Sequence, residues 1–240
     1  MKRKLADVVA WLDATLDASA FDDVANNGLQ LARKGDGICR VAFAVDASAR
    51  AVRAAAEAGA QLLVAHHGIS WGGGIKRISG AVYNVVKPAM DADLAVYASH
   101  LPLDAHPSLG NNAQLARLLG LGRVRPAFTY HGNVIGCVGV GRRARKVDIG
   151  GRTVALAAGD VVGVCSGGAG SFAEDAKRLG CDVYVTGEAD WGEVVAAENC
   201  GMKMVCCGHY ATEVFGVRAV AAAMARALKV EAVDLTDELA

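Results

Sequence analysis

Two adjacent histidines stand in the motif VAHHG at residues 64–68. They follow a strand-like run over residues 61–65, and a short apolar run that ends in polar residues and a glycine is typical of a buried strand leading into a loop. Imidazole is the commonest metal ligand in proteins. The pair indicates either a metal site or, as the alternative, one buried, hydrogen-bonded histidine beside a solvated one.

Two further stretches place histidine or carboxylate after an apolar run, namely HLPLD at residues 100–104 and GHYATE at residues 208–213. Because loops at strand ends carry the chemistry of α/β proteins, the three stretches indicate one convergent site. Asp104 is a candidate hard oxygen ligand. His209 and Glu213 lie near the start of a predicted helix. If that helix begins by His209, the two side chains share one helix face. If it begins later, the preceding loop must bring them together.

The elements that position these residues alternate between strands and helices. The pattern predicts a strand over 40–45, a helix over 49–58 that Ser48 caps, and the strand 61–65. This is a β-α-β unit with parallel strands. Pro102 predicts an extended loop after the strand 94–98.

A second group of strands, over 133–140, 146–149, 153–158, 161–165, 182–185 and 203–207, precedes a helix over 212–228. We expect an α/β fold of two α/β domains with mixed, partly parallel sheets and the metal site between them at strand ends. The expected domains are residues 1–124 and 125–240, with the final helix, about 212–229, as a candidate for packing back on the first domain.

The composition argues against several classes of protein. The chain has 240 residues, of which 53% are hydrophobic and 21% charged, with a formal net charge of zero. This argues against disorder and against a general nucleic-acid binder. No run approaches the roughly 18 apolar residues of a spanning helix, so we expect no membrane association. Seven cysteines without a C-x-x-C motif favour reduced thiols and a cytoplasmic protein.

Four stretches keep two interpretations open. Trp71, in the loop GISWGGG (68–74), either packs on the protein or covers a ligand. The turn GRRARK (141–146) carries either solvated hairpin charges or a phosphate-facing patch. The turn SGGAGS (166–171) lacks the lysine of a P-loop, so it is either a phosphate cradle or a site of close packing. The stretch NNGLQ (26–30) is either a loop or an element that borders the site.

Together these motifs resemble the YbgI-like dinuclear-metal family, short bacterial form, whose members are often named GTP cyclohydrolase I type 2 homologues. The resemblance includes NNGLQ, the residues 46–48, 110–112, 167–170 and 186–188. It implies a homohexameric ring, a trimer of dimers, with metal pairs on its inner wall. Pro102 and the residues 190–192 depart from the family's pattern.

The ligands that the resemblance implies are His66, His67, Asp104, His209 and Glu213. His100 matches a position beside the metals, where it would orient Asp104 or a bound water.

Such a donor set has a chemistry of its own. Three imidazoles and two carboxylates are too many for one tetrahedral zinc with an open position. They suit two divalent metal ions per chain that share a carboxylate, with Glu213 or Asp104 as the bridge. Nitrogen and oxygen ligands favour zinc, iron, manganese, cobalt or nickel. Two such ions about 3.5 Å apart activate water for attack on an ester, a phosphoester or a purine ring carbon.

We therefore expect a dinuclear metal-dependent hydrolase that acts on a nucleotide-like small molecule, and the resemblance points to GTP cyclohydrolase-like ring hydrolysis. The alternative is a non-enzymatic metal-binding ring that acts as a scaffold, a metal carrier or a nucleic-acid partner. The neutral charge weakens the nucleic-acid variant, because phosphate neutralisation drives such binding. A third hypothesis is a purely structural metal, which predicts a large loss of stability on chelation.

Overall fold

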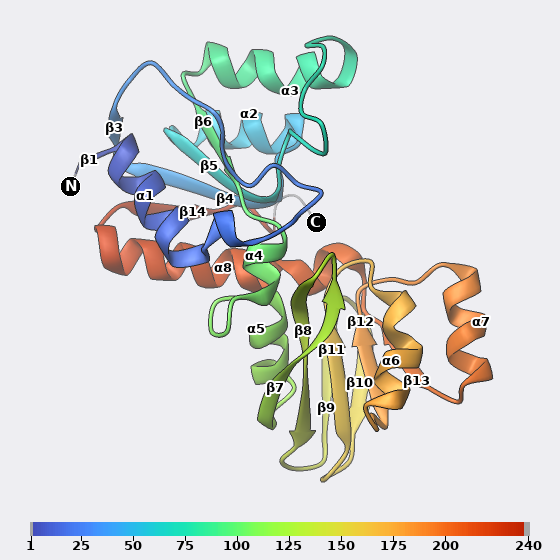
Figure 1. Ribbon diagram of the computed structural model, residues 1–240. Coiled ribbons are helices and arrows are strands. Elements are labelled where there is room, and N and C mark those ends of the chain that lie inside the picture. Colours follow the sequence, from blue (N-terminus) through green and yellow to red (C-terminus); the bar gives the residue numbers. More distant parts are fainter. Residues whose placement is uncertain (1, 238–240) are drawn as a thin grey trace. The chain divides into compact units, whose positions relative to one another are not determined.

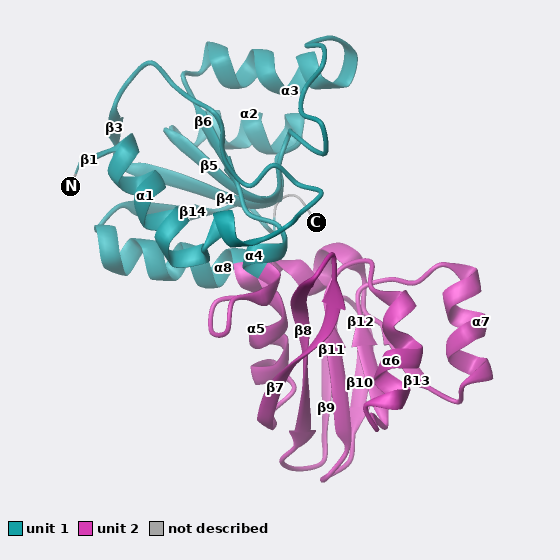
Figure 2. Ribbon diagram, viewed as in Figure 1, with its two compact units in different colours: residues 1–103, 217–240 teal, residues 104–216 magenta. Residues whose placement is uncertain are grey.

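The computed structural model describes residues 2–237 and divides the chain into two compact units (Figure 2). Unit 1 comprises the residues up to Leu103 and those from Val217 onward, and unit 2 comprises Asp104–Gly216. Residue 1 and residues 238–240, which the expected domains include, lie outside the described residues. The mixed α/β fold class is confirmed. The division lies after residue 103, whereas the sequence placed it after residue 124.

Unit 1 is built on a five-stranded sheet with the order β14-β4-β5-β6-β2 (Figure 1). Its strands are β2 (Gly28–Leu31), β4 (Arg40–Asp46), β5 (Leu62–His67), β6 (Ala95–Ala98) and β14 (Glu231–Asp234). Strands β14, β4, β5 and β6 are parallel, and β2 pairs antiparallel with β6. The parallel pairing of β4 and β5 confirms the β-α-β unit, and the carboxyl ends of β5 and β6 lie at one edge of the sheet.

Helices cover both faces of this sheet. They are α1 (Leu5–Leu16), α2 (Ala49–Glu57), α3 (Gly80–Asp91) and the second part of α8 (His209–Leu228). The predicted cap is confirmed, because the Ser48 side chain accepts from the backbone N–H of Ala51 at the start of α2. Helices α2 and α3 lie on one face of the sheet (Figure 1). They pack there against alanine, valine and leucine side chains of the strands. On the other face, the Tyr97 hydroxyl donates to Asp13 of α1 at 2.8 Å.

Unit 2 contains a second five-stranded sheet and a hairpin. The sheet strands are β7 (Leu121–Tyr130), β8 (Asn133–Gly141), β11 (Val161–Cys165), β12 (Val183–Thr186) and β13 (Lys203–Cys206), and the hairpin strands are β9 (Arg145–Ile149) and β10 (Arg152–Leu156). The sheet order is β13-β12-β11-β8-β7. Strands β11, β12 and β13 are parallel, whereas β7 and β8 are antiparallel. Both units therefore have mixed sheets, as the sequence predicted.

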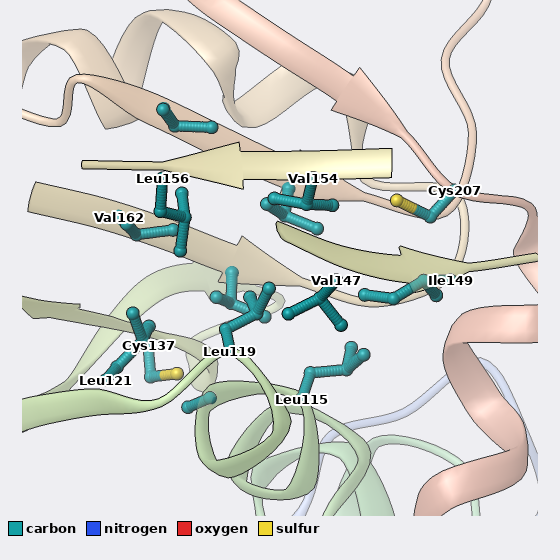
Figure 3. Packing of buried hydrophobic residues seen from close by; sticks show 14 residues of the cluster. Leu115, Leu119, Leu121, Cys137, Val147, Ile149, Val154, Leu156, Val162 and Cys207 are labelled. Carbon is teal, nitrogen blue, oxygen red and sulfur yellow. The ribbon is translucent and has the colours of Figure 1, made fainter. Parts of the chain in front are cut away.

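The core of unit 2 explains why its boundary lies before residue 124. The remaining helices are α4 (Leu101–Ala105), α5 (Asn111–Leu118), α6 (Ala173–Arg178) and α7 (Trp191–Asn199). Leu115 and Leu119, in and just after α5, are fully buried in one hydrophobic cluster with Val147, Val154 and residues of the sheet (Figure 3). Because α5 packs against these strands, it belongs to their unit, although it precedes them in the chain.

Short elements complete the fold. They are β1 (Arg3–Lys4), β3 (Gly37–Ile38) and the 3-10 turns η1 (Ala18–Ala20) and η2 (Gly170–Phe172). The expected extended loop at Pro102 is wrong, because α4 begins at Leu101. A proline is tolerated in the first helical turn, where its missing N–H has no intrahelical partner to lose. Within residues 2–237, no helix is both long and apolar enough to cross a membrane.

Candidate metal centre

His66 and His67 are the last two residues of β5. His66 is fully buried, and its Nδ1 lies 2.9 Å from the carbonyl oxygen of Ser99. The Nδ1 of His67 lies 2.8 Å from Oδ1 of Asp46, which is its register partner on the parallel strand β4. Strand β4 therefore supplies the acceptor for His67, and the residue directly after β6 supplies the one for His66.

His100 follows β6 directly and is held by Asp23. Its Nδ1 lies 2.8 Å from Asp23 Oδ1. The same carboxylate accepts from the Asn27 side chain at 2.8 Å and from the backbone N–H groups of Ala25 and Leu101, each at 3.0 Å. Burial by itself raises the pKa of Asp23, but the hydrogen bonds from His100, Asn27 and Ala25 outweigh it and lower the pKa to about 2. Asp23 is therefore an ionised anchor for the His100 ring.

The three imidazoles converge. The ring centroid of His66 lies 4.6 Å from that of His67 and 5.1 Å from that of His100, and each ring offers one nitrogen within 4.8 Å of the others. A carbonyl oxygen or a carboxylate accepts, so the Nδ1 of each ring donates, and in a neutral ring the lone pair is then on Nε2. Metal-binding histidines are ordered in this way. This group could hold a metal ion.

Unit 2 contains a pair of buried carboxylates. Asp104 and Glu213 are 7% and 2% exposed, and each offers an oxygen within 4.8 Å of the other. Asp104 Oδ1 accepts from the Asn111 side chain at 2.9 Å and from the Ser166 hydroxyl at 3.0 Å. Two buried carboxylates at this separation repel one another, so the pair suits a site that receives a cation.

His209 stands beside this pair. Helix α8 begins at His209, so the expected sharing of one helix face is confirmed, with His209 Nε2 3.2 Å from Glu213 Oε1. Its Nδ1 lies 2.9 Å from Glu188 Oε1. The hydrogen bond to Glu213 is the main cause that raises the pKa of His209, to about 9, against the effect of burial. A proton on His209 therefore offsets part of the charge of Glu188 and Glu213.

The glycine-rich turn serves close packing around Glu213. Gly167 has φ +67°, and a Cβ at this position would lie 2.4 Å from Glu213 Oε1. Its backbone N–H donates to the Thr212 hydroxyl at 3.0 Å. Of the two interpretations of the turn, close approach is the one that these contacts support.

The sequence-predicted residues thus fall into two groups. His66, His67 and His100 gather in unit 1, and Asp104, His209 and Glu213 belong to unit 2. Sequence reasoning missed Asp23 as the anchor of His100, because a carboxylate 77 residues before its partner leaves no spacing signal. The glutamate that anchors His209 could have been found, because Glu188 follows the apolar strand β12. Arg142 and Arg143 of the cationic turn are exposed.

The donor chemistry fits divalent ions. Histidine nitrogens and carboxylate oxygens suit zinc, iron, manganese, cobalt and nickel. No thiol is among the donors, and burial raises the pKa of Cys137 to about 12 and that of Cys181 to about 11, so these two thiols stay protonated at neutral pH. Both are buried, free thiols, which agrees with the reduced cysteines that the sequence predicted.

Curated relatives share most of the chain. The protein named GTP cyclohydrolase 1 type 2 homolog of Deinococcus radiodurans is 40% identical over 230 residues, which cover 90% of this chain and 86% of that protein. The protein of the same name from Escherichia coli K12 is 34% identical over 231 residues, covering 90% and 91%.

Solved structures agree with the fold. The structure of the protein ybgI, of unknown function, has a TM-score of 0.83 at 30% identity and covers 97% of each chain. TTHA1606 from Thermus thermophilus has a TM-score of 0.79 at 29% identity, covering 97% of this chain and 98% of the other. The model of the family Duf34/NIF3 (NGG1p interacting factor 3) matches residues 3–238. The chain therefore belongs to the Duf34/NIF3 family.

Proposed function

We propose that this protein is a dinuclear metal-dependent hydrolase that acts on a nucleotide-like small molecule. The observation that carries the proposal is the ordering of the unit 1 imidazoles. His66, His67 and His100 each have Nδ1 against an oxygen acceptor, at 2.8 to 2.9 Å. A packing role requires no common tautomer, whereas metal binding requires an Nε2 lone pair on each ligating ring.

The proposed ligands of two divalent ions are the five residues named from the resemblance, with His100 beside them. These ligands are His66, His67, Asp104, His209 and Glu213. The chain itself links the two groups of donors, because His100 and Asp104 are only four residues apart. Helix α8 contributes His209 and Glu213 to unit 2 and continues into unit 1.

The residues around the donors have defined roles in this proposal. Bound divalent ions would polarise a substrate oxygen and lower the pKa of a water toward neutrality. Asp46, Asp23 and the carbonyl of Ser99 hold the three imidazole rings in place. Asn111 and Ser166 donate to Asp104, which orients its carboxylate and limits its motion.

The substrate class follows from the names of the relatives. These relatives are named GTP cyclohydrolase 1 type 2 homologues. Our finer proposal is therefore that the substrate is a guanine nucleotide and that the reaction is hydrolytic opening of the guanine ring. A homohexameric ring and a cytoplasmic location stay predictions. Light scattering coupled to size-exclusion chromatography measures the first.

The test combines metal content with activity. Elemental mass spectrometry of the purified full chain should find about two divalent ions per chain, as a two-metal site requires. The variants His66→Ala and Glu213→Ala should lose them. The control is His131→Asn, since His131 is exposed and has φ 47°, which asparagine tolerates. The same preparations are then screened for hydrolysis of GTP and of generic phosphoesters.

Three results are distinguishable. Turnover that follows metal content across the variants supports the hydrolase. Bound metal without turnover on any compound overturns the hydrolase and favours the alternative, a metal carrier or scaffold. No bound metal after reconstitution with zinc, manganese, iron, cobalt and nickel overturns the metal centre itself.

A further inference from the structure

Trp71 is an exposed aromatic side chain that is held in one position. It is 39% exposed, although its indole Nε1 donates to the carbonyl oxygen of Gly68 at 3.0 Å. Its ring lies edge-on to His100, with centroids 5.2 Å apart and planes at 71°, and 5.9 Å from the ring of His67. A tryptophan that serves packing alone buries its surface, whereas this ring keeps part of its surface in water.

The loop that carries Trp71 is tied to the neighbouring chain. Gln30 Oε1 accepts from the backbone N–H groups of Ile69 and Ser70 at 2.6 and 3.1 Å. Trp71 pairs with Ala25 in an isolated antiparallel bridge. Gly68 keeps Gln30 close, because a Cβ on Gly68 would lie 2.3 Å from Gln30 Oε1. The loop therefore fixes the ring before any ligand arrives, which lowers the entropy cost of binding.

A pocket opens beside the ring, entirely within unit 1. Its volume is about 400 Å³, within the range of small-molecule sites. It is lined by Asp46, Ala47, Ser48, His67, Gly68 and Trp71. The lining thus includes the aromatic ring of Trp71 and the carboxylate of Asp46, whose side chain is 51% exposed. Because His67 also lines it, the pocket adjoins the imidazole group.

We propose that this pocket binds the planar heterocyclic base of the substrate, with Trp71 as the stacking wall. Aromatic rings stack on bases through their π-faces, and the exposed carboxylate of Asp46 can accept from N–H groups at the edge of a base such as guanine. Trp71 would then determine specificity for the base rather than for the sugar or the phosphate. The proposal rests on the proposed function for its substrate class.

Calorimetric titration of the full chain tests the proposal. Guanosine 5′-monophosphate is the base-bearing probe and ribose 5-phosphate the probe without a base. Trp71→Ala should weaken binding of the nucleotide about 10-fold or more, as loss of one base-aromatic stack does, while Trp71→Phe keeps most of the affinity. The control is Trp191→Ala, since Trp191 is 78% exposed and belongs to unit 2. Circular dichroism verifies that each variant is folded.

The outcomes separate this proposal from the hydrolase. Nucleotide binding that depends on Trp71 and exceeds ribose 5-phosphate binding supports the stacking pocket, even where no metal preparation shows turnover. The stacking pocket is overturned if the protein binds both probes equally, or if Trp71→Ala binds the nucleotide as well as the unchanged protein does. This holds even where metal-dependent turnover is found. Titrations of chelator-treated protein should retain the effect of Trp71→Ala, because stacking of a base on the indole ring requires no ion.

Discussion

Replacing Asp23 by asparagine should destabilise unit 1. Asp23 Oδ1 accepts from His100 and Ala25, and Oδ2 accepts from Asn27 and Leu101. An asparagine turns one of these two oxygens into an amide nitrogen, which then faces two donors. The Asp23 side chain is only 1% exposed, so water cannot replace the lost acceptor.

The pKa gives the size of the electrostatic contribution. Lowering the pKa of Asp23 from 3.8 to about 2 corresponds to about 2 kcal/mol of stability. Because the folded-state pKa is the lower one, this stability is fully present above the unfolded pKa and is lost as the pH falls through about 2. Between pH 5 and pH 3, about 1 kcal/mol of it should disappear.

Urea unfolding followed by tryptophan fluorescence measures this contribution in unit 1. The Trp191→Phe background removes the tryptophan of unit 2, so the remaining Trp11 and Trp71 report on unit 1 alone. At pH 5, Asp23→Asn should lower the free energy of unfolding by about 2 kcal/mol. At pH 3 the other carboxylates titrate equally in the proteins with and without Asp23→Asn. The difference in free energy of unfolding between the two proteins should therefore be smaller than at pH 5 by about 1 kcal/mol. An equal free energy of unfolding at pH 5, or a difference independent of pH, would refute the anchoring role of Asp23.

Three further predictions concern unit 2. Gly167→Ala should lower metal content and stability, because its Cβ would lie 2.4 Å from Glu213 Oε1. The control Gly180→Ala should cost only the backbone strain, since Gly180 has a similar φ of +76° and open space at its Cβ position. Equal effects of the two variants in elemental analysis and thermal melts would contradict this prediction. Leu119→Ala should cost about 2 to 5 kcal/mol in urea unfolding followed by circular dichroism, because Leu119 is fully buried. A loss below about 1 kcal/mol would contradict its place in the core. Asp190→Ala removes the capping box of α7 and should cost about 1 kcal/mol in thermal melts, with no change in metal content.

Local structure near the candidate site was predictable from the sequence. The apolar runs before His66 and before His100 form strands β5 and β6, and Ser48 caps α2. These features depend on neighbours within a few residues, so hydrophobic periodicity and capping preferences reveal them. The four-residue spacing of His209 and Glu213 left the start of the helix open, and helix α8 settles it by beginning at His209.

Other features depend on partners that are distant in the chain. The short strand β14 was missed, because four residues at an edge carry little periodicity and gain their pairing from β4, about 190 residues earlier. Pro102 was expected in a loop because proline disfavours helix interiors, but its position in the first turn of α4 avoids that cost.

The α/β class, the strand ends that carry histidine and carboxylate, and the family all follow from the amino-acid sequence. The three-dimensional fold was needed to show that α5 belongs to unit 2, that Asp23 anchors His100 across 77 residues, and that Trp71 lines a pocket beside His67. The physical reason is the range of the interactions. Strands and helices follow from local periodicity, whereas the acceptor that fixes an imidazole ring can come from any part of the chain that the fold brings near.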